Sequence, residues 1–138
     1  MSETLPLGTG LPEDGPFMND RQKEYFRKKL LGWKADILRE SRETLEALAS
    51  ENANQADAAD RASSETDRAI ELRARDRQRK LIAKIDAAIE RIDDGTYGYC
   101  EETGEPISLR RLDARPIATL SLEAQERHER REKVYRDE

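Results

Sequence analysis

The sequence predicts a mainly α-helical protein: a long antiparallel coiled-coil hairpin with a small globular base and a C-terminal helix. Apolar residues recur at intervals of three, four and seven over two long segments, which is the pattern of amphipathic helices. Charged residues make up 40% of the chain and aromatic residues only 5%, which favours long solvated helices over one compact core. We divide the chain into a leader (1–18), a hairpin (19–94), a base (95–120) and a final helix (121–138).

The leader is rich in proline and glycine and has no basic side chain up to residue 16. We expect it to be flexible, with Leu5, Leu7 or Leu11 as docking side chains. The first helix should begin at a cap, Asn19 or Asp20, and end near Asn52. Its apolar positions are Tyr25, Phe26, Leu30, Leu31, Ile37, Leu38, Leu45 and Leu48.

Residues 53–62 interrupt the apolar pattern with small and polar side chains, so we expect them to form the tip of the hairpin. Either Asp57 or Asp60 can cap the returning helix, and this structural role explains one carboxylate but hardly both. The returning helix should run to Gly95, with Ile70, Ala74, Leu81, Ile85, Ala88 and Ile92 on one face. At a rise of about 1.5 Å per residue, such a hairpin is on the order of 50 Å long.

The base concentrates glycine, proline and tyrosine between helical segments, which is typical of loops or a short hairpin. Ser121 can cap a final helix that continues to about Tyr135, with Leu122 and Val134 turned inward.

Composition excludes several classes of protein. The net charge of −5 gives no overall electrostatic footprint for nucleic acid, so sequence-specific DNA binding is not expected. A single cysteine, Cys100, allows no intramolecular disulfide, and no apolar segment approaches the length of a membrane span. We therefore expect a soluble cytoplasmic protein.

The returning helix carries six basic residues and one acidic residue between 73 and 84, a local charge of +5. Arg73, Arg77, Lys80 and Lys84 share one helix face. A solvated face is the plain alternative, but clustered Lys and Arg also suit a polyphosphate or an acidic protein partner.

Two stretches of the base, Gly98-Tyr99-Cys100-Glu101-Glu102-Thr103-Gly104-Glu105-Pro106-Ile107 and Arg110–Pro116, resemble the zinc-finger region of the DksA/TraR family of RNA polymerase-binding transcription factors. The tip and the basic segment resemble the same family, and the match covers about residues 20–125. The resemblance implies a regulator of bacterial transcription initiation that enters the secondary channel of the polymerase, acts as a monomer and is not itself an enzyme. It also implies action with guanosine tetraphosphate (ppGpp) in the stringent response.

The resemblance further implies roles for particular residues. Asp57, Asp60 and Ala62 would act at the tip near the polymerase active centre, with Asn54 as a weaker candidate. The positions that match the ppGpp site at the polymerase interface are Arg77, Leu81, Lys84 and Arg115.

The family's zinc frame falls here on Cys100, Thr103, Ser121 and Ala124. Neutral hydroxyls and a methyl group cannot replace three thiolates, so we expect a zinc-independent fold without a bound cofactor. His128, one turn beyond Ala124, is expected to be an ordinary surface residue. A Gre-like transcript cleavage factor and a coiled-coil scaffold remain the alternatives; the base resembles neither.

Overall fold

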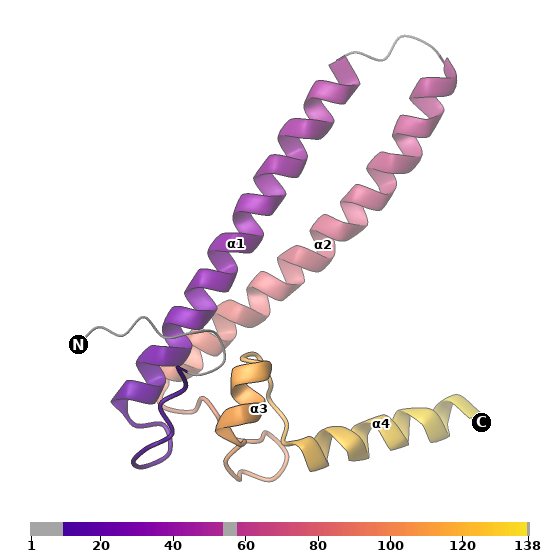
Figure 1. Ribbon diagram of the computed structural model, residues 1–138. Coiled ribbons are helices and arrows are strands. Elements are labelled where there is room, and N and C mark those ends of the chain that lie inside the picture. The colour runs from indigo at the N-terminus through magenta and orange to yellow at the C-terminus, as the bar shows by residue number, and fades with distance from the viewer. Residues whose placement is uncertain (1–9, 54–57, 138) are drawn as a thin grey trace. The chain divides into compact units, whose positions relative to one another are not determined.

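The computed structural model describes residues 10–53 and 58–137, the side chains of residues 48, 51–53, 58–64 and 135–137 excepted. Over these residues it contains the helices α1 (Asp20–Ala53), α2 (Ala58–Asp94), α3 (Leu109–Ala114) and α4 (Leu122–Asp137), shown in Figure 1. This confirms the predicted mainly helical fold with a long helical hairpin. The chain divides into a hairpin unit, residues 31–86, and a globular unit, residues up to 30 and from 87 onward.

The start of α1 is fixed by two reciprocal hydrogen bonds. Asn19 Oδ1 accepts the backbone N–H of Gln22 at 3.0 Å, which confirms one of the two predicted caps. The side chain of Gln22 in turn accepts the backbone N–H of Met18 at 2.6 Å. This arrangement is a variant of the capping box: it satisfies one free donor of the first helical turn and the N–H of the residue before the cap.

Residues 10–18 make specific contacts with the rest of the globular unit. Leu11 is half-buried, whereas Leu5 and Leu7 lie outside the described residues, so the flexibility of the leader stays a prediction. Gln22 is fully buried, and its amide nitrogen donates to the carbonyl of Pro12 at 3.0 Å. The Phe17 ring meets Tyr99 edge-on, with centroids 5.4 Å apart. It also lies so close to Gly98 (φ +91°) that a Cβ there would come within 3.1 Å of the ring. Composition could not reveal these contacts, because they form with residues distant in sequence.

The end of α2 confirms the predicted stop at Gly95. This glycine has φ +86°, and the next two backbone N–H groups, of Thr96 and Tyr97, return to the carbonyl of Arg91. Tyr97 then enters the core of the globular unit, where it is 1% exposed and its hydroxyl donates to the carbonyl of Pro116 at 2.8 Å. The other buried apolar side chains of this unit are Met18, Phe26, Leu30, Ala88, Ile92, Cys100, Ile107, Leu112, Ala118 and Ala124.

Two features of the globular unit differ from the prediction. The short helix α3 was not expected; Ser108 caps it by accepting the N–H of Arg111, and Pro116 follows soon after its end. Ser121 caps α4 as predicted, but Leu122 and Val134 are mostly exposed instead of turned inward. The reason is that Ala124, on another face, is the fully buried residue of α4, and its small side chain allows close approach of the helix.

The hairpin unit buries only part of the apolar pattern expected on α1. Ile37 is buried, whereas Leu31, Leu38 and Leu45 are 48%, 44% and 40% exposed. One turn after Ile37, the next inward position is polar: Ser41 donates to Gln78 Oε1 at 2.5 Å. On α2, Ile70 is also exposed, so the expected apolar seam is wrong at these positions.

Candidate functional sites

The predicted tip lies largely beyond what the structure describes. Asn54 and Asp57 are outside the described residues. Asp60 and Ala62 belong to the first turns of α2, but their side chains are not described. A carboxylate in the first turn of a helix is favourable next to the positive end of the helix dipole, so Asp60 suits its place on structural grounds alone. The functional role of the tip stays a prediction.

The basic segment of α2 is only partly neutralised by its own acid. Asp76 accepts from Arg79 and, at 3.3 Å, from Lys80; these hydrogen bonds lower the pKa of its carboxyl group. Among the residues that the structure describes, no carboxylate lies within 4 Å of Arg77 or Lys84. The nearby Asp86 is engaged elsewhere.

That engagement is with α1: Lys34 Nζ lies 2.7 Å from Asp86 Oδ1. Leu81, between the two unpaired cations in sequence, is half-buried. The hairpin unit therefore presents Arg77 and Lys84 as exposed cations free to meet an external anion.

Arg115, the fourth predicted effector residue, belongs to the globular unit and ends α3, where its N–H donates to the carbonyl of Arg111. The structure describes this residue within its own unit, so its participation with the hairpin cations stays a prediction. Its position on α3 is set by a network that sequence reasoning missed.

In that network, Asp113 Oδ1 accepts from the Tyr25 hydroxyl and from Lys29 Nζ, both at 2.5 Å. Burial and the hydrogen bond to Asp113 raise the pKa of Tyr25 to about 12. Burial alone would raise the pKa of Asp113, but the hydrogen bonds from Lys29 and Tyr25 lower it. Tyr25 and Lys29 of α1 thus hold α3 through Asp113, which lies two residues before Arg115.

The residues of the zinc frame do come together. Cys100 is buried, and its sulfur is hydrogen-bonded by the backbone of Ser121 and by the backbone and hydroxyl of Thr103. Burial would raise the pKa of the thiol, but these hydrogen bonds lower it to about 6. Ala124 is fully buried, and its N–H donates to Ser121 Oγ at 3.2 Å.

This donor set does not fit structural zinc, which takes four Cys or His ligands. The frame supplies one thiol, two neutral hydroxyls and a methyl group, and no cluster of three metal-ligating side chains occurs within the described ranges. His128 does not point to a metal: its Nε2 lies 3.1 Å from Glu102 Oε1, and Arg127 and Arg131 lie near the same carboxylate. These contacts tie α4 to the turn that follows Cys100.

Two family models match the chain. One, described as DnaK suppressor protein DksA, N-terminal domain, matches residues 22–92, and the other, a prokaryotic dksA/traR C4-type zinc finger, matches residues 95–130. The second keeps its match although three of the four cysteines are absent here.

Among curated proteins, the RNA polymerase-binding transcription factor DksA of Caulobacter vibrioides (strain NA1000 / CB15N) is 73% identical over 126 residues, 91% of this chain and 89% of that protein. The protein of the same name from Escherichia coli (strain K12) is 41% identical over 117 residues, 85% of this chain and 78% of that protein. The solved structure of transcription factor DksA2 from Pseudomonas aeruginosa has a TM-score of 0.80 and 43% identity, and the match covers 87% of this chain and 92% of that one. The chain therefore belongs to the DksA/TraR family, and its curated relatives are named RNA polymerase-binding transcription factors.

Proposed function

We propose that this protein binds RNA polymerase directly and regulates transcription initiation in the bacterial cytoplasm. The observation that carries the proposal is the 73% identity with a protein named for this activity, over nine tenths of the chain. The hairpin would enter the secondary channel, with the tip residues Asp57, Asp60 and Ala62 near the active centre. A regulator of this kind acts by binding unequally to the polymerase conformations along the initiation pathway, and needs no catalysis of its own.

The proposed co-regulator is ppGpp, held between the factor and the polymerase. Arg77 and Lys84 support this role because they are exposed and have no carboxylate partner among the described residues. Each can give a phosphate oxygen a charge-assisted hydrogen bond. Arg115 and Leu81 complete the proposed site. Zinc has no part in it, and neither does sequence-specific contact with DNA.

The test is transcription in vitro from a ribosomal RNA-type promoter, with polymerase that lacks any ppGpp site of its own. Lys84→Ala should keep the free energy of unfolding within about 0.5 kcal/mol of the parent's, because the side chain is exposed. Its response to ppGpp should weaken about ten- to a hundredfold, which corresponds to the loss of roughly 1.5–3 kcal/mol. The matched control is Lys80→Ala, a lysine already paired with Asp76, which should respond nearly as the parent does.

Unchanged titrations for Lys84→Ala and Arg77→Ala would refute the effector site but not the binding of polymerase. Failure of the parent to bind polymerase would refute the function itself. Shortened transcripts from a backtracked complex would instead favour a Gre-like cleavage factor, which neither family match supports.

A further inference from the structure

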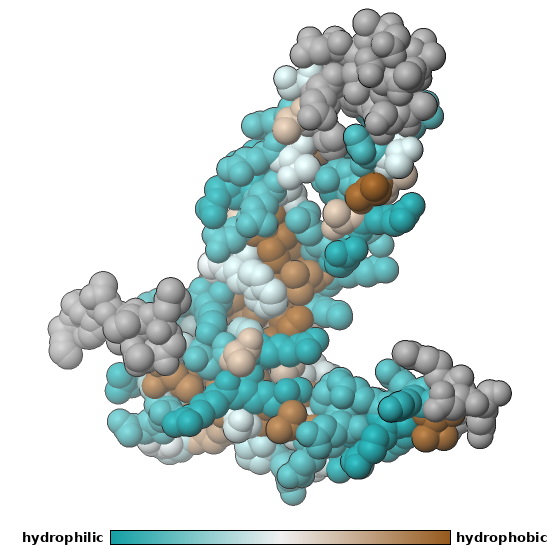
Figure 2. Space-filling view, turned by 45° about the vertical axis from the view of Figure 1, so that its right-hand side comes forward, coloured by the Kyte–Doolittle hydropathy of each residue, from teal (hydrophilic) through white to brown (hydrophobic). Residues whose placement is uncertain are grey.

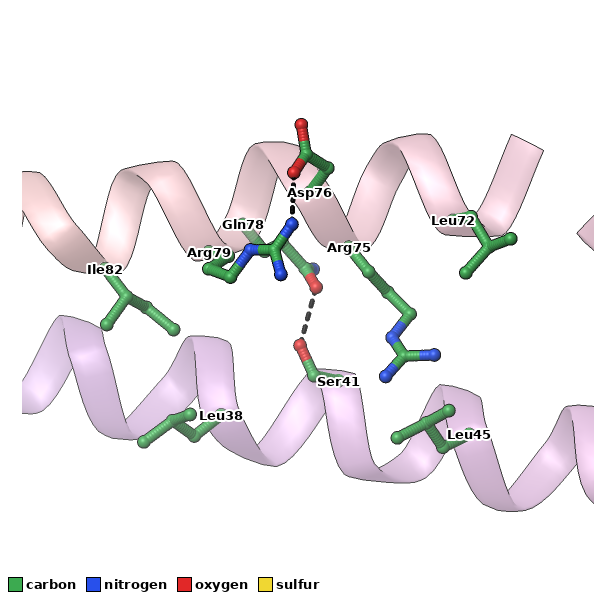
Figure 3. Close-up of a pocket in the computed structure, with 9 residues that line it drawn as sticks. All are labelled: Leu38, Ser41, Leu45, Leu72, Arg75, Asp76, Gln78, Arg79 and Ile82. Atoms are coloured by element: carbon green, nitrogen blue, oxygen red, sulfur yellow. Dashed lines mark hydrogen bonds and ion pairs between the residues drawn. The ribbon is translucent and has the colours of Figure 1, made fainter. Parts of the chain in front are cut away.

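A groove runs between α1 and α2 in the middle of the hairpin unit. It has a volume of about 380 Å³, and its apolar wall comes from Leu38 and Leu45 of α1 and from Leu72 and Ile82 of α2. Figure 3 shows these four side chains on either side of the Ser41–Gln78 hydrogen bond. Hydrophobic surface is visible along the hairpin in Figure 2.

The wall on α1 is part of a regular apolar stripe that the hairpin leaves partly exposed. Leu31, Leu38 and Leu45 are spaced by seven residues and are 40–48% exposed. Leucines at this spacing lie on one line along a helix and, in coiled coils, face another helix. The inward positions of α1 are taken instead by Ile37 and Ser41.

A cation without a partner lies beside this stripe. Arg75 is exposed, extends toward α1 near Ser41 and Leu45 in Figure 3, and has no carboxylate within 4 Å in the described part of the chain. The neighbouring Arg79 is held by Asp76. A guanidinium group next to exposed leucines suits a carboxylate carried on an apolar helix.

This surface differs from the proposed effector face. Successive residues of an α-helix are rotated by about 100° around its axis. On α2 the inward positions are Ala74 and Gln78, so Arg75 lies on one side of them and Arg73 on the other. Arg77 and Lys84 lie on the side of Arg73. The groove therefore lies on a second face of the hairpin. The proposed ppGpp site does not account for the positive charge of Arg75 on this face.

We propose that the groove binds an acidic amphipathic helix of a protein partner, which lies along α1 and α2 as a third helix. A helix is favoured over an extended segment because the exposed leucines repeat every seven residues. An acidic helix is favoured over a basic one because its carboxylates would pair with the guanidinium group of Arg75, which a basic helix would repel. The inference goes beyond the function proposed above and does not depend on ppGpp.

The experiment uses the full chain and two synthetic helical peptides of roughly 21 residues, three heptads long. Both carry leucine at the heptad core positions; the remaining positions are mainly glutamate in one and lysine in the other. Binding is followed by fluorescence anisotropy of the labelled peptides, at concentrations where each peptide is monomeric. The acidic peptide should bind the parent at least tenfold more tightly than the basic one.

The variants locate the contact. Arg75→Glu should reverse the preference between the peptides, whereas the matched control Arg73→Glu, on the other side of the same helix, should leave it within twofold. The double variant Leu38→Gln/Leu45→Gln should weaken both peptides at least tenfold. If this double variant does not fold, the comparison of Arg75→Glu with Arg73→Glu alone tests the proposal.

Three results would overturn the proposal: no binding of the acidic peptide, equal binding of the two peptides, or equal effects of Arg73→Glu and Arg75→Glu. A fourth such result could come from the oligomeric state of the parent protein, measured by sedimentation. A dimer that the double leucine variant converts to monomers would show that a second copy of the chain occupies the groove, in place of a partner's helix.

Discussion

Replacing Asp113 by Asn tests the network that holds α3 against α1. Asparagine keeps the size and one acceptor oxygen but removes the charge that Lys29 neutralises. A hydrogen bond to a charged group contributes about 1.5–3 kcal/mol. The Asp113 side chain is 17% exposed and Lys29 is 38% exposed, so solvent screening reduces the expected loss to about 1–2 kcal/mol.

A loss of that size should lower the melting temperature by about 3–8 °C for a chain of this length. Circular dichroism during thermal and urea unfolding measures it. Asp93→Asn is the matched control, because Asp93 pairs with Arg27 at the same 2.5 Å but its side chain is 61% exposed. The control should cost within about 0.5 kcal/mol. Equal losses for the two variants would refute the reasoning that burial makes the Asp113 network stronger.

The same network predicts a pH dependence. The pKa of Tyr25 is raised to about 12 in the folded protein, so its contribution is present below the ordinary value near 10 and is lost as pH rises through 12. The pKa of Asp113 is lowered, so its contribution is present above the ordinary carboxyl range and is lost as pH falls through the lowered value. The stability difference between parent and Asp113→Asn should therefore be constant from about pH 5 to pH 9.

Three further predictions concern the zinc frame, the tip and the leader. Protein purified without chelator should contain no stoichiometric zinc, and excess chelator should leave its melting temperature unchanged; one zinc per chain with a large loss of stability would contradict this. Asp60→Asn should keep its affinity for polymerase but lose most regulation, whereas normal regulation of ribosomal RNA-type promoters would leave the carboxylate with a purely structural role. Gln22→Ala should cost about 1–3 kcal/mol, because it leaves the buried Met18 N–H and Pro12 carbonyl unpaired; Gln125→Ala, whose hydrogen bond is exposed, should cost much less.

Local features of the fold could be predicted from the sequence. Asn19 and Ser121 cap helices and Gly95 ends one because each acts on backbone groups a few residues away. The phase of the hairpin could not be predicted, because Ile37 and Leu38 are adjacent and apolar, and either one completes the pattern. Packing of both helices selects Ile37.

The candidate sites divide in the same way. A positive segment is visible in the sequence, but which of its cations are neutralised depends on Asp76 and on the Lys34–Asp86 pair between two helices. The contact of Tyr25 with Asp113 joins residues 88 positions apart, and the spacing of apolar residues in the sequence does not predict it. The mutual approach of Cys100, Thr103 and Ser121 follows from the family frame, whereas their hydrogen bonds required the structure.

The Ser41–Gln78 hydrogen bond also specifies the alignment of the two hairpin helices. In an antiparallel pair, a slip of one heptad would bring Ser41 opposite Ile85 or Glu71, and its bond with Gln78 would be lost. A polar layer that is satisfied in only one register excludes the others, at a cost in stability compared with an apolar layer. The two residues are 37 positions apart. Their pairing therefore determines how many of the intervening residues belong to the outgoing helix and how many to the returning helix. An apolar replacement of both side chains would then be expected to tolerate alternative registers, each of which gives the turn a different set of residues.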